Sequence, residues 1–373
     1  MKLKLTLIIG LISVITIFGN NPNKLLYNKA LDNLFKNPDY SLQLAQKLLK
    51  LDSDPNNQAK YYILSSTAYI AKRDFEASLN ENLKAKALLN EISDHSVRSN
   101  VLLNIAIQYQ QIELFSKSFE TLKDAESEIE HMQDNQKIKF SILGKIDAVR
   151  GMIYKSQSNP ELALEKFFNA VNNLKNNQAD PTTQSNLSVV YYNIGYCYLD
   201  MQDKHNAEKY YQESLKYAKK IKAKSLEAFA LKGLAEVYFV DRNYEKALEV
   251  LNEAESLATH IGDLVLNEGI YLAKAENYLV LNNFSSYKKY NEKYIDTFYK
   301  RQQSEIQSIS SAIDHQVTIN KESNQKLISK HQKVNYTILV IGGVMMIIMF
   351  YLMIKFNKKR ISIQNQLKSI STK

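Results

Sequence analysis

One pattern of residue sizes recurs six times between residues 62 and 291 and constrains the fold more than any other feature. Each copy has a large residue, an apolar one, a very small one and an aromatic, and later a second small residue four positions before a large one. The clearest copy consists of Tyr191, Ile194, Gly195, Tyr198, Ala207 and Tyr211. Small residues at fixed positions let two helices approach closely, while large ones fill the remaining space. The pattern therefore predicts antiparallel helix pairs that stack on one another.

This pattern resembles the tetratricopeptide repeat family over roughly residues 24–300. The resemblance implies an all-α solenoid of helical hairpins, with about six repeats plus terminal helices, that binds proteins or peptides and rarely does chemistry. The chain differs from the family's usual repeat in two ways. The chain has no tryptophan, so Tyr or Leu takes the large first position, and the repeats are longer than the family's unit of about 34 residues. The small residues Ser66, Ala106, Gly151, Gly195, Ala235 and Ala275 lie 40, 45, 44, 40 and 40 residues apart.

By the same resemblance, groove-facing residues lie on the first helix of each unit, beside the pattern positions. In the two best units these are Val189, Tyr192, Tyr196, Leu199, Phe229, Lys232, Glu236 and Phe239, joined upstream by Leu103, Ile107, Lys145 and Met152. Such an apolar and aromatic wall suits an extended or helical peptide with apolar anchors. The alternative is that the longer helices curl inward and these residues pack against each other. The basic and asparagine residues with which chaperone-tail-binding relatives grip a terminal carboxylate are not evident.

The N-terminus has the pattern of a secretory signal. Lys2 and Lys4 precede an uncharged apolar run that ends at Phe18. This run is short for a membrane span of about 20 residues, so residues 1–19 are predicted to be a signal peptide. The cleavage site after Gly19 is poor because Ile17 is bulky. An uncleaved anchor is therefore the alternative.

A second hydrophobic run, residues 334–354, contains no charged residue and is long enough to cross a bilayer. It is apolar on all sides, unlike a soluble amphipathic helix. Lys355, Lys358, Lys359 and Arg360 follow it at once. The excess of positive charge predicts a cytoplasmic tail, residues 355–373, and a solenoid outside the inner membrane, in the periplasm.

The net charge of the chain supports the same division. The formal charge is +9, of which residues 355–373 contribute six and Lys2, Lys4 and Lys24 contribute three. Residues 25–354 therefore sum to zero. A neutral solenoid lacks the electrostatic footprint of a nucleic-acid-binding protein, so we expect no nucleic acid to bind it.

Residues 301–333 are polar and free of proline and glycine, which predicts a helical stalk between solenoid and membrane. A seven-residue spacing of core positions gives a weak coiled-coil signal that permits a homodimer. The positions are Ile306, Ile313, Asn320, Leu327 and Val334. A single solvated helix fits this stretch equally well.

The residue patterns of known catalytic and metal sites are missing from the sequence. Cys197 is the only cysteine, so an intramolecular disulfide is impossible, and the six histidines show no metal-ligand spacing. Phosphate-binding and nucleophile motifs are also missing. The sequence therefore predicts neither a catalytic site nor a metal site or cofactor.

The order of signal, repeats, stalk, span and basic tail resembles membrane-tethered bacterial tetratricopeptide regulators without their usual output domain. We expect a membrane-anchored periplasmic protein that binds a peptide or protein, for signal reception or regulation across the inner membrane. The alternative is a structural adaptor that holds an envelope complex together without switching.

Overall fold

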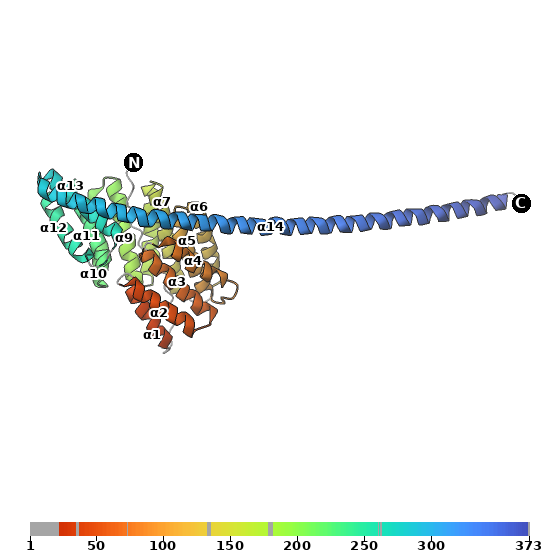
Figure 1. The fold of residues 1–373 in the computed structure, drawn as a ribbon, viewed down its shortest axis with the longest axis horizontal. Coiled ribbons are helices and arrows are strands. Elements are labelled where there is room, and N and C mark those ends of the chain that lie inside the picture. The colour runs from red at the N-terminus through yellow and green to blue at the C-terminus, as the bar shows by residue number, and fades with distance from the viewer. Residues whose placement is uncertain are drawn as a thin grey trace. The chain divides into compact units, whose positions relative to one another are not determined.

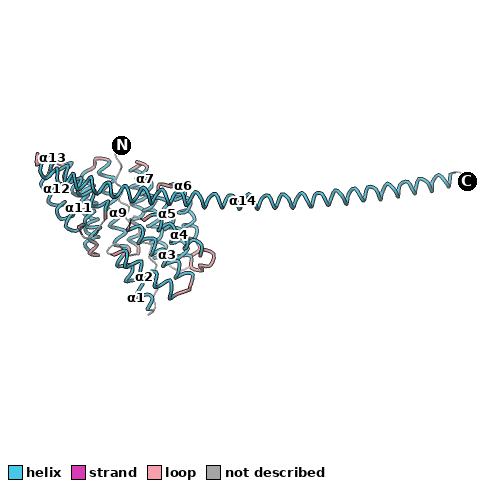
Figure 2. The backbone as a smooth tube through the Cα atoms, in the orientation of Figure 1, coloured by secondary structure: helices cyan, strands magenta, loops and turns pink. Residues whose placement is uncertain are grey.

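The computed structural model describes residues 22–34, 37–72, 74–132, 136–177, 182–259, 261 and 263–371. Every regular element in these residues is an α-helix, which confirms the predicted all-α fold (Figures 1 and 2). The helices are α1 Pro22–Asn33, α2 Pro38–Leu51, α3 Pro55–Ala71, α4 Phe75–Ala87, α5 His95–Gln111, α6 Phe115–Glu130, α7 Gln136–Ser156, α8 Pro160–Lys175, α9 Thr183–Asp200, α10 Lys204–Lys220, α11 Lys224–Val240, α12 Tyr244–Ala258, α13 Leu264–Val280 and α14 Phe284–Ser371. The predicted signal peptide, residues 1–19, lies outside the described residues.

The helices form successive hairpins, with α1 and α2 first and α3 with α4 as the first of the six repeats. The first helix of each hairpin contacts the first helix of the next, from α1 through α13. Each second helix from α2 to α12 contacts its own partner and the first helix of the following hairpin. The first helices therefore make one layer and the second helices the other.

In each of the six repeats the turn between the two helices closes on the aromatic residue of the repeated pattern. The backbone N–H five residues after that aromatic donates to its carbonyl oxygen, at N···O distances of 2.8 to 3.0 Å. The accepting residues are Tyr69, Tyr109, Tyr154, Tyr198, Tyr238 and Tyr278. This contact is the Schellman closure of a helix C-terminus. After Tyr238, Arg242 takes a φ of 59° and Asn243 caps α12 by accepting from the N–H of Lys246 at 3.2 Å.

The small residues of the pattern make room for large side chains of the second helices. A Cβ atom on Gly151 would lie 2.6 Å from the ring of Phe167, and one on Gly195 would lie 2.8 Å from the ring of Tyr211. Tyr211 is fully buried and also lies against the next unit, because a Cβ on Gly233 would come within 2.4 Å of the same ring. The Tyr211 ring therefore occupies the space between α9 and α11.

The chain divides into two compact units, Met1–Ala312 and Ile313–Lys373. The predicted stalk, residues 301–333, and the predicted span, residues 334–354, both fall within α14. One segment of the described chain, Asn324–Asn365, is long and apolar enough to cross a membrane. Its large apolar side chains are exposed, as at Leu339 (73%) and Ile347 (70%). The homodimer through the stalk stays a prediction.

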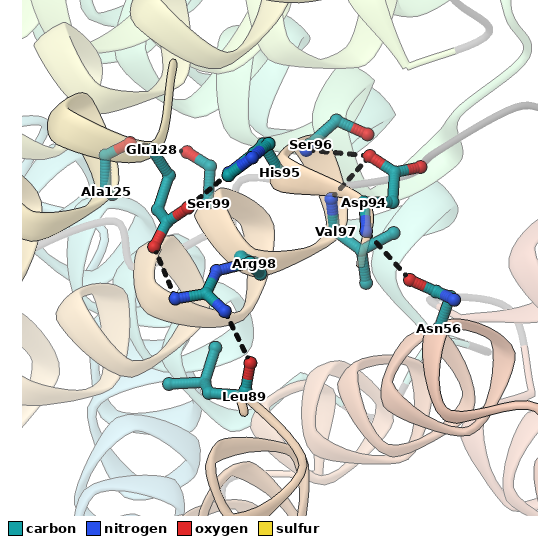
Figure 3. A network of polar contacts seen from close by, with 10 residues as sticks. All are labelled: Asn56, Leu89, Asp94, His95, Ser96, Val97, Arg98, Ser99, Ala125 and Glu128. Carbon is teal, nitrogen blue, oxygen red and sulfur yellow. Dashed lines mark hydrogen bonds and ion pairs between the residues drawn. The ribbon is translucent and has the colours of Figure 1, made fainter. Parts of the chain in front are cut away.

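A polar network ties the start of α5 to the helices around it (Figure 3). Glu128 of α6 is 2.8 Å from Nδ1 of His95 and 2.8 Å from Arg98, which also donates to the carbonyl of Leu89 at 2.7 Å. Asp94 caps α5 through its carboxylate, and its own N–H donates to the side chain of Asn56 in α3. Burial raises the pKa of Glu128, but hydrogen bonds and charge from Arg98 and His95 outweigh burial and lower it overall.

We predict that Gly233→Ala destabilises the solenoid. The new methyl group would overlap the Tyr211 ring, and overpacking of this kind costs about 1–3 kcal/mol. This exceeds the gain of up to ~1 kcal/mol in helix propensity from Ala. The measurement is chemical unfolding of the full chain in detergent, followed by circular dichroism.

Gly342→Ala is the matched control, because no atom lies within 4 Å of a Cβ built there. In a Tyr211→Leu background the cost of Gly233→Ala should shrink, since the ring is gone. If Gly233→Ala unfolds at or above the denaturant concentration of the unsubstituted chain, the packing argument is wrong.

Glu128→Gln is expected to lower the free energy of unfolding at neutral pH by about 1 kcal/mol, because two charge-assisted hydrogen bonds are weakened. The folded-state pKa of Glu128 lies below its usual 4.5, so its contribution is present above pH 4.5 and is lost as pH falls through the folded-state value. Urea unfolding at neutral and acidic pH measures both effects. Glu130→Gln, on the exposed side of α6, is the control and should change little. A Glu128→Gln deficit that stays constant into strong acid would contradict this assignment.

Candidate functional site

A pocket opens on the face formed by the first helices of the last three repeats. Its volume is about 330 Å³. The lining residues are Tyr196, Leu199 and Asp200 of α9, Ala235, Glu236, Phe239 and Val240 of α11, and Ala273, Glu276 and Asn277 of α13. The pocket exists because first helices stack directly on one another, so that equivalent positions of three successive units meet on one face.

The structure brings four of the predicted groove residues together in this pocket: Tyr196, Leu199, Glu236 and Phe239. The other four lie in the packed interior, with exposed fractions of 2% for Val189, 3% for Tyr192, 3% for Phe229 and 5% for Lys232. Tyr192 and Phe229 contact each other at 6.0 Å between ring centroids. The upstream residues Leu103, Ile107, Lys145 and Met152 are also buried. A role in binding for any of these residues stays a prediction.

Lys232 lies directly behind the pocket wall. Its Nζ donates to Glu236 at 2.5 Å, one helical turn away on α11. Burial disfavours the charged form of Lys232, but the carboxylate of Glu236 and the phenol of Tyr192 outweigh it and raise its pKa. Lys232 therefore stays protonated, and Glu236 serves as the counter-charge of a buried cation.

The ring of Tyr196 is held from the neighbouring unit. Lys155 of α7 lies 4.9 Å from its centroid and donates to Asn193 at 2.5 Å. Burial, followed by the carboxylates of Asp200 and Glu236, raises the pKa of Tyr196 to about 12. The phenol therefore stays neutral at physiological pH.

Asn277 is the pocket residue with an unused hydrogen-bonding atom. Its side chain is 1% exposed, and its Nδ2 donates to the carbonyl of Ala273 at 2.7 Å. Its Oδ1 has no hydrogen-bond partner among the described residues. An unsatisfied buried carbonyl of this kind costs about 1–3 kcal/mol. The sequence reasoning did not single out Asn277, although it lies two residues after the pattern residue Ala275.

The helix α13, which carries Asn277, also holds the start of α14. Lys274 is buried and donates to Glu255 of α12 at 2.5 Å and to the hydroxyl of Tyr290 at 2.9 Å. Arg301 of α14 forms a two-pronged ion pair with the buried carboxylate of Glu268, at 2.5 and 3.2 Å. One helix therefore contributes both to the pocket and to the attachment of α14.

In the part of the chain that the structure describes, no group of three or more His, Cys, Asp or Glu residues is arranged to hold a metal ion. Cys197 is buried. The arrangement suits recognition of a ligand by contact, charge and hydrogen bonding.

Comparison with known families matches a tetratricopeptide repeat model to residues 186–260, which include most of α9 and all of α11. No curated protein matches the sequence. Among solved structures, a Rap protein complexed with competence and sporulation factor is 15% identical, with 77% of this chain and 89% of that chain covered at a TM-score of 0.53. NprR complexed with its cognate peptide NprX is 17% identical, with coverage of 74% and 78% and a TM-score of 0.51.

A third similar structure is a signal transduction ATPase with numerous domains from Pyrococcus horikoshii, which has a tetratricopeptide repeat sensor. It is 15% identical and covers 82% of this chain, but only 49% of its own length is matched, at a TM-score of 0.53. At these identities the likeness concerns the fold. The family match covers residues 186–260, and the repeated pattern and the shared fold agree with a solenoid of tetratricopeptide type.

Proposed function

We propose that this protein is a single-pass inner-membrane receptor or regulator whose solenoid binds a peptide or protein partner in the periplasm. The observation that carries the proposal is the pocket on the first-helix face. Aromatic rings, carboxylates and an unsatisfied amide oxygen surround a space of about 330 Å³ there. Recognition sites of this size combine apolar walls with a few placed polar groups.

Two of the similar structures, the Rap protein and NprR, were determined with a factor or peptide bound. Both share the solenoid fold with this chain at TM-scores above 0.5. A stack of first helices offers an extended surface on which a chain of several residues can make successive contacts. This supports a peptide or an extended protein segment as the ligand.

Membrane anchoring is supported by the second unit of the chain. The uncharged stretch of residues 334–354 lies in α14 and exposes its apolar side chains, as a lipid-facing helix does. Lys355, Lys358, Lys359 and Arg360 follow it directly. Positive charge next to a span favours the cytoplasmic side, so the solenoid would lie on the other side.

Coupling between ligand and membrane is supported by the attachment of α14. Glu276 and Asn277 line the pocket, while Glu268 and Lys274 on the same helix hold Arg301 and Tyr290 of α14. A ligand that contacts α13 would act on the helix that anchors α14. This arrangement favours signal reception over a purely static role.

The proposal predicts that a photo-cross-linking residue at position 239 captures a partner. Phe239 lines the pocket, whereas Phe168 is exposed on the second helix α8. Benzoylphenylalanine at 239 in cells should give a discrete adduct, identified by mass spectrometry, because the partner contacts the first-helix face. The same residue at 168 should give none above background. Equal products at both positions, or none at 239, would contradict binding at this face.

The proposal also predicts the topology of the chain. Alkaline phosphatase, which is active only after export, should be active when it is joined after residue 300 and inactive when it is joined after Lys373. Replacement of Lys355, Lys358, Lys359 and Arg360 by glutamine should weaken this bias, since these charges set the orientation. Enzyme assays on whole cells give the readout. An active fusion at Lys373 would show that the predicted orientation is wrong.

A further inference from the structure

One buried residue of the pocket differs from its counterparts in the other repeats. Asn277 follows the pattern residue Ala275 by two positions. The residues at the same place in the earlier repeats, all 0% exposed, are Ala68, Gln108, Ile153, Cys197 and Val237. Four of these are apolar or weakly polar, and Gln108 uses both ends of its amide, accepting from Asn82 and donating to the carbonyl of Phe75. Asn277 alone in this set has a buried oxygen without a hydrogen-bond partner among the described residues.

The atom that Asn277 leaves unpaired is an acceptor. Its Nδ2 donates to the carbonyl of Ala273, one helical turn earlier, at 2.7 Å. The opposite orientation of the amide would bring two oxygens together, so Oδ1 is the atom without a partner. The side chain is 1% exposed, and a buried carbonyl of this kind is unfavourable. Because Asn277 lines the pocket, a ligand that brings a hydrogen-bond donor to it would remove this cost.

The ionised groups of the pocket do not favour a charged ligand. Glu236 accepts from the buried Lys232 at 2.5 Å. Asp200 and Glu276 each have an interaction partner of their own within the protein. A ligand carboxylate would meet three carboxylates, and a ligand ammonium group would lose hydration without gaining an unused counter-charge, which is costly. The donor that fits this pocket is therefore uncharged.

The walls of the pocket are mainly apolar and aromatic. Tyr196 and Phe239 come from the neighbouring helices α9 and α11. The lining also contains Leu199, Val240 and two alanines. Aromatic rings pack favourably against one another in offset or edge-to-face arrangements, beyond the effect of the area that they bury. A flat aromatic group on the ligand therefore suits these walls.

Size and hydrogen bonding together select the ligand group. The pocket, at about 330 Å³, lies at the lower end of the range for small-ligand sites and admits a single large side chain. Serine and threonine would leave much of this space unfilled. Asparagine, glutamine and tyrosine bring an oxygen that needs a donor of its own when buried. The indole of tryptophan is apolar apart from one N–H, which only donates.

We propose that this pocket binds one tryptophan side chain of the peptide ligand, whose indole N–H donates to Oδ1 of Asn277 and whose ring packs against Tyr196 and Phe239. The indole supplies the donor that the last repeat lacks at this position. This inference rests on the proposed peptide-binding function and names the residue type that the ligand must contain.

The test is selection of random heptapeptides, displayed on phage, against the full chain in lipid nanodiscs. The panning is repeated on Asn277→Val, which removes the acceptor and introduces the residue type that the preceding repeat has at the same place, as Val237. The matched control is Asn100→Val on α5, outside the pocket lining. Asn100 is 2% exposed, its Nδ2 donates to the carbonyl of Ser96 at 2.7 Å, and its Oδ1 also lacks a partner among the described residues. Melting curves establish that all three proteins are folded.

We expect the unsubstituted chain and the control to enrich peptides with a tryptophan at one fixed position. A selected peptide is then compared with its benzothienylalanine analogue, in which sulfur replaces the indole N–H and the ring shape is kept. By calorimetry the analogue should bind the unsubstituted chain about three- to tenfold more weakly, as expected for one lost hydrogen bond. Both peptides should bind Asn277→Val with equal affinity. The comparison on the unsubstituted chain needs no variant, so it decides the question even if Asn277→Val fails to fold.

Two results would overturn the inference and leave peptide binding intact. One is enrichment of peptides with a fixed residue other than tryptophan, or with no fixed residue. The other is equal binding of the tryptophan peptide and its analogue to the unsubstituted chain, because the indole N–H would then make no hydrogen bond in the pocket.

Two further outcomes would contradict the proposed function as well. If no peptide family is enriched on any of the three proteins, the proposed function fails and this inference falls with it. If no peptide is enriched but indole itself binds saturably and loses affinity in Asn277→Val, the pocket recognises a free aromatic molecule. That result would overturn the assignment to a peptide side chain.

Discussion

The solenoid depends on a steric constraint that is repeated in every unit: the first helix must leave space for a large side chain of the second. Tyr211 shows this most clearly, because its ring contacts two glycines from different units. Gly195 belongs to its own hairpin and Gly233 to the next, and a Cβ on either would come within 3 Å of the ring. One side chain therefore fixes both the hairpin and the stacking of successive hairpins.

This packing leaves a buried polar group without a hydrogen bond, which is unfavourable. The hydroxyl of Tyr211 is buried and has no hydrogen-bond partner among the described residues. Burial raises the pKa of this phenol well above its usual value, so the group stays neutral. A leucine in this place would leave part of the space empty, and such a cavity is itself destabilising. Close stacking of α9, α11 and α13 is in turn what places Tyr196, Glu236 and Asn277 around one pocket.

Much of this architecture follows from the sequence because residue size alone carries the repeat. Gly195 and Tyr198 mark the first helix, and the carbonyl of Tyr198 closes the turn in the same register as in the other units. The repeated pattern does not include Gly233, which lies two residues before the pattern position Ala235. Gly233 contacts the Tyr211 ring of the preceding repeat and not a residue of its own hairpin. A one-dimensional pattern records contacts within a hairpin better than contacts between hairpins.

The candidate site was harder to predict, because a groove residue differs from a core residue only by a rotation of its helix. Tyr196 and Lys232 both lie beside pattern positions, yet Tyr196 lines the pocket and Lys232 lies behind it. Part of the expected wall faces the interior, where Tyr192 packs against both Tyr211 and Phe229. The hydrogen-bond state of Asn277 depends on its neighbours in three dimensions. The spacing of residues in the sequence therefore cannot predict that the side-chain oxygen of Asn277 lacks a partner.

The ion pairs of α13 link the pocket helix to α14, and they determine what a bound ligand would have to do to move α14. A buried pair such as Glu268 with Arg301 adds little net stability, because removing two charges from water offsets most of their attraction. It does fix geometry, since either group left alone in the interior would be costly. A ligand can change the contact between α13 and α14 only if it binds one arrangement of α13 more tightly than another. Glu276 and Asn277 line the pocket on the same helix that carries Glu268, so a ligand that contacts them would contact the helix whose position the ion pair specifies.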